Sequence, residues 1–329
     1  MLEHGGNLNA ARQQYNIALA DWLDLSTGIN PNGWPVPDKL PSTVWSHLPI
    51  ENDGLLTAAQ HYYQCDDLLA VAGSQAAIQA LPRLRKHSRV GLLTPAYAEH
   101  AHAWRQAGHT VIELESSAIN DALPELDVLV IINPNNPTAE LFSPLQLLAW
   151  HQKLAQHGGW LLVDEAFMDC TPEYSLLDNR PLEGLILLRS IGKFFGLAGL
   201  RVGFVFATPT LLNALADLLG PWPIAQASRY ITKLALSDTH WQEQQRHALP
   251  LSSQRLSDLL TRYNLSPTAG STLFQWISTL QAEKWHQQLA QQGVFTRLFK
   301  EPASLRFGLP KDESDWQRLA QALENISPS

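Results

Sequence analysis

The feature of this sequence that most restricts its fold is a regular alternation of short apolar segments with amphipathic ones. Segments with the periodicity of helices occur at residues 55–64, 73–84, 98–107 and 143–157. Apolar runs typical of buried strands separate them, at residues 68–72 and in RVGLLTPAY, HTVIELE, VLVIINPNNPT, GWLLVDEAF and LILLRS. Buried strands that alternate with helices form a mostly parallel sheet with helices on both faces. The sequence therefore predicts an α/β fold.

The pattern changes after about residue 225. A long amphipathic stretch, 226–263, is followed by strand-like segments and a helical tail, in TAGSTLFQWIS, GVFTRLF, ASLRFGLP and DESDWQRLAQALEN. The first 50 residues are rich in Pro, Asn and Gly, which is typical of an ordered arm. We predict a large domain over residues 40–225 and a smaller α+β domain formed by residues 1–39 and 226–329.

Composition argues against several classes of function. The formal net charge is −8 and no basic run stands out, so nucleic acid is not expected as a partner. No apolar run reaches the ~18 residues of a membrane helix, and the N-terminus lacks a basic-then-apolar signal. The two cysteines, Cys65 and Cys170, lack CxxC spacing, so no disulfide framework and no metal site is expected. We expect a cytoplasmic protein without a membrane partner.

Polar clusters follow the predicted strands at the points where they end. They are GSQ, TPAY, NPNNPT, DEAF and RSIGK, in chain order. In parallel α/β sheets, ligands bind beyond the carboxyl ends of the strands. We therefore expect the functional site at this edge of the sheet.

Lys193 has unusual neighbours for a lysine. It lies in SIGKFFGLAGLRVGF, between Ile191-Gly192 and Phe194-Phe195. Desolvation disfavours the charged ammonium and lowers the pKa of a lysine, and a neutral amine is a nucleophile that forms Schiff bases. The alternative is a lysine whose stem packs on apolar groups while its ammonium reaches solvent.

Two further strand ends carry groups with more than one interpretation. Asp164 follows the apolar run WLLV, where an acid serves as a helix cap, a metal ligand or the partner of a protonated heterocyclic nitrogen. Asn133, Asn135 and Asn136 lie among prolines, which ordinary turn chemistry also explains. A ligand-facing edge of the sheet gives the same residues a binding role.

A third set of residues is suited to an anion. Gly73-Ser74-Gln75 connects a strand to a helix, and the free N–H groups at a helix start favour phosphate. Ser190 and Arg201 flank the lysine and offer a hydroxyl and a guanidinium to the same group. Tyr97 supplies a flat face for stacking, although a core aromatic explains it equally. Amine, carboxylate, amide, aromatic face and phosphate cradle together are what a pyridoxal phosphate site needs.

With these motifs in this order, the chain resembles the fold-type I pyridoxal-phosphate enzymes, in the branch that contains histidinol-phosphate aminotransferase. The matching segments are GSQAAI, TPAY, NPNNPT, DEAF, SIGKFFGLAGLRVGF and LRFGLP, and they span nearly the whole chain. The resemblance implies a fold with a large domain, built on a mostly parallel sheet flanked by helices, and a smaller α+β domain. It also implies pyridoxal 5'-phosphate as the cofactor and a homodimer.

The resemblance implies a role for each matching residue. Lys193 is the lysine that bonds the cofactor, and Asp164 binds the pyridine nitrogen. Asn136 binds the ring hydroxyl and reaches the substrate, and Tyr97 stacks on the ring. Arg306, in LRFGLP, pairs with a substrate carboxylate. The cofactor phosphate is held by Ser74, Gln75, Ser190 and Arg201.

The N-terminal segments HGGN and DLSTGINPNGWP are similar to those of the L-threonine-O-3-phosphate decarboxylases of cobalamin biosynthesis. That group implies a carboxy-lyase that converts L-threonine O-3-phosphate into (R)-1-amino-2-propanol O-2-phosphate. It also implies that His4, Gly5 and Gly28 bind this phosphorylated amino acid, since a glycine pair permits close backbone approach.

At three places the sequence differs from the aminotransferases, and these differences argue against transamination more than against cofactor binding. They usually carry a tyrosine where this chain has Phe167, a serine where it has Gly192, and a Tyr-Pro pair where it has Leu48-Pro49. Two alternatives stay open, because the same groups serve more than one bond cleavage at Cα. One is an aminotransferase of the histidinol-phosphate type, and the other is a non-catalytic partner in the cobalamin pathway.

Overall fold

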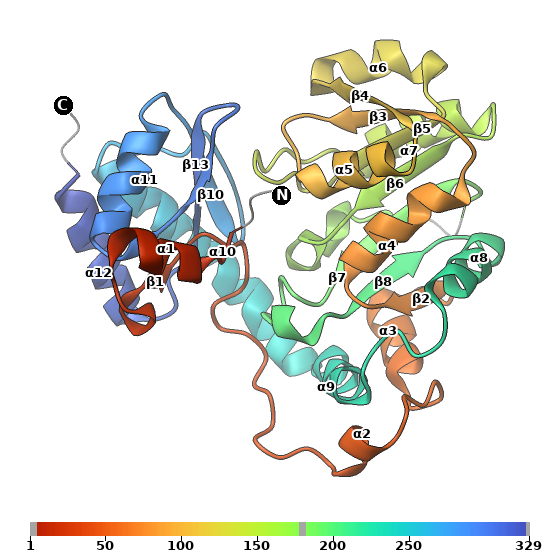
Figure 1. Cartoon of the computed structure of the whole chain (residues 1–329), viewed down its shortest axis with the longest axis horizontal. Coiled ribbons are helices and arrows are strands. Elements are labelled where there is room, and N and C mark those ends of the chain that lie inside the picture. The colour runs from red at the N-terminus through yellow and green to blue at the C-terminus, as the bar shows by residue number, and fades with distance from the viewer. Residues whose placement is uncertain (1–4, 178–181, 327–329) are drawn as a thin grey trace. The chain divides into compact units, whose positions relative to one another are not determined.

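The computed structural model describes residues 5–177 and 182–326 (Figure 1). Packing divides the chain into two compact units, which we call the large and the small unit. The large unit comprises residues 33–136 and 140–243, and the small unit comprises residues 1–32, 137–139 and 244–329. The divisions at 32/33 and 243/244 differ from the predicted bounds at 39/40 and 225/226. A domain must be able to fold by itself, which a division by packing does not test. The domain bounds therefore stay a prediction.

The centre of the large unit is a sheet with seven strands among the described residues. In spatial order they are β2 (Leu68–Val71), β8 (Gly203–Phe206), β7 (Leu185–Ser190), β6 (Trp160–Asp164), β5 (Val128–Ile132), β3 (Arg89–Leu93) and β4 (Thr110–Leu114). β8 runs antiparallel to both of its neighbours, and all the other pairs are parallel. The predicted mostly parallel sheet is confirmed.

Helices cover this sheet because its strands are apolar on both sides. α4 (Ser74–Ala80), α5 (Ala98–Gln106) and α8 (Pro209–Leu219) lie on the face that Figure 1 turns to the viewer. Their apolar side chains form one core cluster with Val128 and Val130. Leu129 and Ile131 alternate with these and are also fully buried, so the second face is covered as well.

The remaining α-helices described in this part of the chain include one that packs against β6 and one that packs against β2. They are α2 (Thr43–Ser46), α3 (Leu55–Tyr63), α6 (Ile119–Ala122), α7 (Pro144–Ala155) and α9 (Gln226–Ser237). The predicted amphipathic stretch 226–263 is two helices, because α10 (Thr239–Arg262) begins anew after Asp238. The Asp238 carboxylate accepts a hydrogen bond from the Trp241 N–H (3.0 Å), which caps the start of α10.

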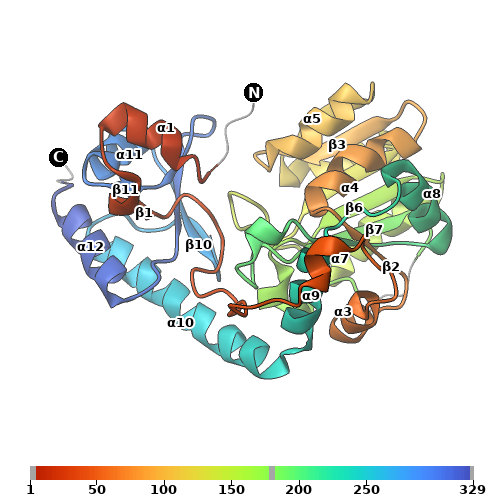
Figure 2. The same ribbon diagram turned by 60° about the horizontal axis from the view of Figure 1, so that its bottom comes forward.

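The small unit is built on an antiparallel sheet in the order β12 (Arg297–Phe299), β13 (Ser304–Gly308), β10 (Phe274–Ser278) and β9 (Ala269–Ser271). The stretch predicted as one strand, TAGSTLFQWIS, is thus a hairpin of β9 and β10. β1 (Leu23–Asp24) pairs in parallel with β11 (Val294–Phe295) and ties the N-terminal arm to this unit. Figure 2 shows α1 (Leu8–Tyr15) beside α11 (Ala282–Gln291), with α12 (Glu313–Glu324) completing the unit.

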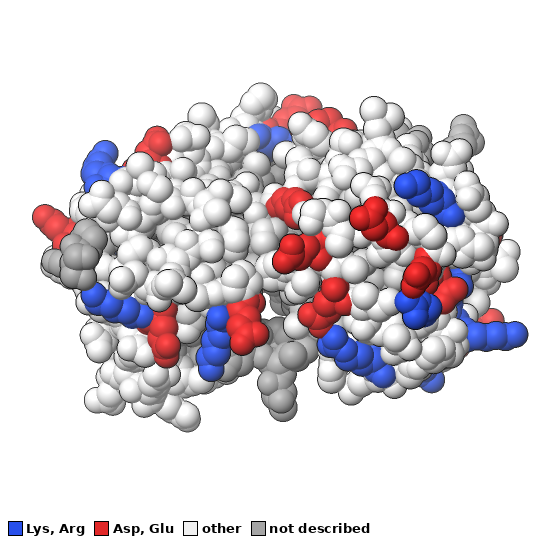
Figure 3. Space-filling model, turned by 90° about the horizontal axis from the view of Figure 1, so that it is seen from above, with Lys and Arg blue, Asp and Glu red and all other residues white. Residues whose placement is uncertain are grey.

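Charged side chains of both signs are mixed over the face shown in Figure 3. Blue Lys and Arg side chains stand next to red Asp and Glu side chains. Two exposed ion pairs of the large unit are Arg89–Glu125 and Arg105–Glu113. Within residues 5–177 and 182–326, no helix is both long enough and apolar enough to cross a membrane. Both cysteines, Cys65 and Cys170, are free.

Candidate functional site

The large unit brings the ends of β6 and β7 to one edge of its sheet. β6 ends at Asp164, β7 ends at Ser190, and the two strands are parallel neighbours. The turn that follows β2 leads into α4 at Ser74. All the residues predicted to hold the cofactor belong to this unit, namely Ser74, Gln75, Tyr97, Asn136, Asp164, Ser190, Lys193 and Arg201.

Close backbone packing shapes the turn before α4. Gly73 has φ +72°, and a Cβ atom at this residue would lie 2.9 Å from a guanidinium nitrogen of Arg201. A Cβ atom at Gly203 would lie 2.5 Å from the backbone nitrogen of Ser74. The positive φ at Gly73 and the backbone atoms beside Gly203 favour glycine at both positions, and the Arg201 guanidinium lies beside the turn that opens α4. Such a set of donors favours an anion with several oxygens.

Ser190 and Arg201, which flank Lys193 in the chain, were also predicted to bind the cofactor phosphate. The Ser190 hydroxyl accepts a hydrogen bond from the Gly192 N–H (3.3 Å), which shapes the turn before Lys193. Arg201 has φ +54° and donates to the Ala198 carbonyl (3.2 Å). A non-glycine residue in the left-handed region is uncommon and is frequently found at functional sites.

The Asp164 carboxylate is held by two bonds and is 4% exposed. One oxygen accepts from the Ala166 N–H (3.1 Å), and the other lies 2.9 Å from Nε2 of His100. His100 is fully buried on α5. Sequence reasoning did not find this histidine, although it stands three residues after Tyr97 and so shares a face of the helix with it.

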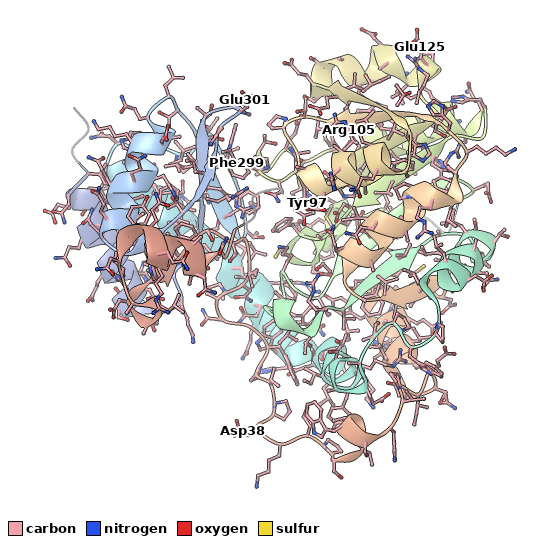
Figure 4. The ribbon with its side chains drawn as sticks, viewed as in Figure 1. Asp38, Tyr97, Arg105, Glu125, Phe299 and Glu301 are labelled. Atoms are coloured by element: carbon pink, nitrogen blue, oxygen red, sulfur yellow. The ribbon has the colours of Figure 1, made fainter. Side chains whose placement is uncertain are left out.

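Tyr97 stands immediately before α5, with Arg105 near the other end of that helix (Figure 4). Its ring is edge-on to the His100 ring at 6.3 Å between centroids. Its hydroxyl donates to the Gln75 side-chain oxygen (3.3 Å). Burial, the negative charges of Glu99 and Asp164, and in the opposite sense Arg201, together raise the pKa of Tyr97 to about 12. The phenol is therefore neutral and keeps its proton at ordinary pH.

Lys193 has the apolar surroundings that its sequence context predicts. Ile191, Phe194 and Phe195 are fully buried, and Lys193 itself is half-buried in the turn after β7. Its Nζ lies 5.3 Å from the centre of the Phe167 ring, at the distance of a cation–π contact. The Lys193 amine thus has an aromatic ring as a neighbour and buried apolar residues on both sides in the chain.

The asparagines of NPNNPT divide into two kinds. Asn133 is buried and bonds in both directions to the backbone of Phe142, with the amide at 3.1 Å and the carbonyl at 2.8 Å. Asn135 donates to the Pro95 carbonyl (2.9 Å) and ties this loop to the one before Tyr97. Turn chemistry thus accounts for these two residues. Asn136 follows them, half-buried, and its binding role stays a prediction.

A buried ionic cluster lies next to these residues in the chain, and sequence reasoning missed it. Arg189 is 2% exposed, and its guanidinium lies 3.0 Å from the Glu165 carboxylate and 2.9 Å from that of Asp169. Glu165 also accepts from the Ser175 hydroxyl (2.7 Å). Because Glu165 follows Asp164 and Arg189 precedes Ser190, the cluster fixes the two strand ends to each other.

Apart from Asn136, which belongs to the large unit, the predicted substrate residues belong to the small unit. His4 lies outside the described residues, and Gly28 is buried in the loop after β1. Gly5 packs on Ser26, since a Cβ atom would lie 2.4 Å from the Ser26 carbonyl oxygen. Arg306 is 6% exposed and donates to that same carbonyl (2.8 Å).

Arg297 is a further basic residue of the small unit that sequence reasoning missed. It stands directly opposite Arg306 across β12 and β13. Burial and the positive charge of Arg297 lower the pKa of Arg306 to about 10, against the opposing effect of Asp24. Two guanidinium groups in one cross-strand pair repel each other, and an anion relieves this repulsion.

No cluster of three or more His, Cys, Asp or Glu side chains suited to a metal ion occurs within residues 5–177 and 182–326. The large unit brings together groups of several chemical kinds. These are a half-buried amine, a buried carboxylate, an aromatic ring and a cradle for an anion.

Comparison with known proteins adds a family. The family described as aminotransferase class I and II matches residues 47–323. The threonine-phosphate decarboxylase of Pseudomonas aeruginosa is 54% identical over 98% of this chain and 97% of its own length.

Solved structures of similar fold share less of the sequence. A histidinol-phosphate aminotransferase from Sinorhizobium meliloti, in complex with pyridoxal-5'-phosphate, has a TM-score of 0.84. It is 17% identical and covers 97% of this chain and 95% of its own. L-threonine-O-3-phosphate decarboxylase from Porphyromonas gingivalis has a TM-score of 0.76 at 20% identity, with 92% and 98% covered.

Proposed function

Since the chain belongs to the family of class I and II aminotransferases, we propose that it is the pyridoxal-phosphate-dependent decarboxylase of L-threonine O-3-phosphate. The observation that carries the proposal is the identity of 54% with a threonine-phosphate decarboxylase along 98% of the chain. The similarity covers nearly the whole chain and nearly the whole length of that relative. The product is (R)-1-amino-2-propanol O-2-phosphate, released together with CO₂.

The residues of the large unit fit pyridoxal phosphate. The space beside Gly73, which a Cβ atom would fill, meets the guanidinium of Arg201 and the N–H groups of the turn before α4. These donors would hold the phosphate, with the Ser190 hydroxyl as a further donor. Asp164 would bind the protonated ring nitrogen, and Lys193 would hold the cofactor through its amine.

When bound, the cofactor supplies an electron sink for the bond that breaks at Cα. The chain's own groups prepare the site for this task. The Asp164 carboxylate is oriented by the His100 ring at 2.9 Å, and a carboxylate at this place can bind a cationic nitrogen. Tyr97 orients the ring by stacking, and Lys193 returns a proton to Cα after CO₂ has left.

The substrate carries two anionic groups, and the small unit offers two arginines. We assign Arg306 to one of them and Arg297 to the other, with the N–H groups around Gly5 and Gly28 as further donors. His4, which lies outside the described residues, is included as a predicted phosphate ligand. A carboxylate that leaves as CO₂ gains nothing from tight binding of its anion, so orientation is the purpose of this contact.

The alternative reaction is transamination, which breaks the Cα–H bond. Phe167 favours decarboxylation, because it gives the Lys193 amine an apolar ring at 5.3 Å. An apolar neighbour keeps water from the position where Cα is reprotonated. Both reactions use the lysine, so Phe167 distinguishes decarboxylation from transamination of the histidinol-phosphate type better than Lys193 does.

The reaction itself is the direct test. Purified protein loaded with pyridoxal phosphate is incubated with L-threonine O-3-phosphate, and we expect release of CO₂ without any 2-oxo acid acceptor. Turnover of histidinol phosphate that depends on an acceptor, with no CO₂ from threonine phosphate, would show that the alternative is right. A protein that binds no pyridoxal phosphate at all would favour a non-catalytic partner.

A lysine variant tests the assignment of the amine. Lys193→Ala is expected to lose both activity and the visible absorbance of the bound cofactor. Lys153→Ala, at an exposed position of α7, is the matched control and is expected to keep both. Retention of the absorbance in Lys193→Ala would show that another amine holds the cofactor.

We also propose that the enzyme is a cytoplasmic homodimer of the cobalamin pathway. Free cysteines agree with a reducing compartment. For the dimer, the large unit exposes apolar side chains in one stretch, with Trp45 70%, Leu48 64% and Ile50 54% exposed. Trp222, 52% exposed, lines a cavity of about 230 Å³ together with Pro49 of that stretch. Exposed apolar groups of this size are typical of interfaces.

Light scattering after size exclusion tests the dimer. Leu48→Glu is expected to shift the protein toward the monomer, because a charge is costly to bury in an interface. Leu280→Glu, at a position 97% exposed in the small unit, is the control and is expected to leave the mass unchanged. A wild-type monomer at micromolar concentration would contradict this part of the proposal.

A further inference from the structure

Glu99 has no role in the chemistry described so far. It is half-buried in the first turn of α5, two residues after Tyr97. We propose that Glu99 is a positioning residue, which fixes Tyr97 through the side chain of Gln75. The inference rests on the proposed function, because Tyr97 is taken to stack on the ring of the cofactor.

The contacts form a chain of three side chains. The Gln75 Nε2 donates to a carboxylate oxygen of Glu99 at 2.8 Å, and the Tyr97 hydroxyl donates to Gln75 Oε1 at 3.3 Å. The amide of Gln75 thus bonds at both of its ends. The Gln75 side chain therefore links Glu99 directly to Tyr97.

Glu99 gives this chain a direction. An ionised carboxylate only accepts hydrogen bonds, so the amide nitrogen of Gln75 must face Glu99. The amide oxygen then faces Tyr97, and the Tyr97 hydroxyl must donate. An uncharged amide at position 99 would permit both orientations of the Gln75 amide. In one of the two, an N–H of Gln75 and not its oxygen faces the Tyr97 hydroxyl.

The chain also links two elements that carry different parts of the site. Gln75 belongs to α4, which begins at the turn with Ser74, and Tyr97 stands at the start of α5. The bodies of the two helices are fixed by apolar packing, with Ile78 and Trp104 in one core cluster. The bonds to Gln75 hold the hydroxyl end of Tyr97, and the ring orientation therefore depends on Glu99.

If Glu99 acted only through its charge, its substitution would strengthen cofactor binding, which is the opposite of what a positioning role predicts. The groups that act on the phenol are Glu99, Asp164 and Arg201, with burial as the largest influence. A carboxylate beside a turn that binds phosphate repels the anion, so its removal would strengthen cofactor binding. A positioning role predicts weaker binding on removal, because Tyr97 loses its fixed orientation.

The test compares four proteins without cofactor and then titrates each with pyridoxal phosphate. Glu99→Ala and Glu99→Gln are expected to raise the dissociation constant about three- to tenfold. The circular dichroism of the visible band of bound cofactor is expected to change, since it reports the ring's orientation. Glu113→Ala, which removes an exposed carboxylate of β4, is the control and is expected to match the wild type.

Unfolding of the proteins without cofactor separates positioning from stability. We expect all four to melt within a few degrees of one another, because Glu99 is half-buried and its loss opens no apolar cavity. A fifth protein, Gln75→Met, breaks the same chain at its centre and is expected to give the same dichroism as Glu99→Ala. If both Glu99 variants bind cofactor as tightly as the wild type, or more tightly, the inference is wrong. If the wild type itself fails to bind, the proposed function falls as well.

Discussion

His100 donates a hydrogen bond from Nε2 to the Asp164 carboxylate at 2.9 Å, and both side chains are almost completely buried. The other ring nitrogen, Nδ1, has no hydrogen-bond partner within the described residues. An ionised carboxylate only accepts hydrogen bonds, so this contact requires the proton on Nε2 of His100. The bond from α5 therefore fixes the orientation of the Asp164 side chain.

Replacement of His100 by Ala removes this bond and opens a cavity beside the carboxylate. We expect the dissociation constant for pyridoxal phosphate to rise about tenfold, because bonds to charged groups are worth about 1.5–3 kcal/mol. His100→Gln offers an amide donor to the same oxygen and is expected to recover part of the loss. Titration of the protein with cofactor, followed by absorbance, measures both.

His102→Ala is the matched control for this prediction. His102 lies on the same helix at an exposed position and is expected to leave affinity unchanged. Wild-type affinity in His100→Ala would mean that Asp164 needs no support from α5.

Gly73→Ala is expected to weaken cofactor binding at the phosphate. The added Cβ would lie 2.9 Å from the Arg201 guanidinium and displace it. Gly158→Ala is a close control, because Gly158 has φ +71° but no atom within 4 Å of its Cβ position. Both variants carry the same backbone strain of about 1–2 kcal/mol, so thermal stability should fall similarly. Affinity for pyridoxal phosphate should fall about tenfold in Gly73→Ala alone, and equal affinities would argue against the cradle.

Periodicity and strand ends predicted the large unit well, for a physical reason. A strand buried on both faces must be apolar throughout, so β5 and β6 could be predicted from their continuous runs of apolar residues. β8 was not predicted, because GFVF directly continues the glycine-rich turn after Lys193 and reads as part of that motif. The helix break at Asp238 was also missed, since a capping residue inside an amphipathic stretch does not interrupt the apolar pattern.

The candidate site was predictable only where a residue stands at the end of a strand. Asp164 and Lys193 follow apolar runs, so their position in the chain marks them. His100, Glu99 and Arg297 act on other residues from helix turns and from an edge strand. Nothing in their local sequence distinguishes them from ordinary surface or core residues, and only the packing of α4 on α5 or of β12 on β13 reveals their contacts.

Arg297→Gln is expected to change stability and substrate affinity in opposite directions. Arg297 faces Arg306 across two strands, so loss of its charge relieves repulsion and should raise the melting temperature slightly. The same loss should raise KM for threonine phosphate about tenfold or more, because one anionic group of the substrate loses its partner. Arg255→Gln, whose exposed partner is Glu313, is the control in the same unit. A fall in stability without a change in KM would mean that Arg297 has a structural role.

Asp53 is expected to make the stability of the large unit depend on pH in the acid range. Burial alone would raise the pKa of Asp53, but the bonds from Arg229 and from the Leu55 N–H outweigh this and hold the pKa below its ordinary value. The carboxylate accepts two bonds from the Arg229 guanidinium at 2.9 Å each, and its side chain is 10% exposed. These bonds attach the segment before α3 to α9.

The sign of the effect follows from the lowered pKa. In the unfolded chain Asp53 takes up a proton near the ordinary value of 3.8, whereas the folded protein resists protonation until the pH is lower. The stabilisation is therefore complete above that value and is lost as the pH falls through the folded pKa. Asp53→Asn should cost about 2 kcal/mol at pH 7, and the difference from wild type should shrink below about pH 4.

Thermal unfolding between pH 7 and pH 3 measures this difference. Asp121→Asn, at an exposed position of α6, is the control and should follow the wild-type curve at every pH. A difference between Asp53→Asn and wild type that stays constant down to pH 3 would mean that the shape of the side chain, and not its charge, stabilises the segment. We expect instead that protonation of Asp53 weakens its bonds to Arg229. The difference in stability between the wild type and Asp53→Asn should therefore decrease gradually as the pH falls through the acid range.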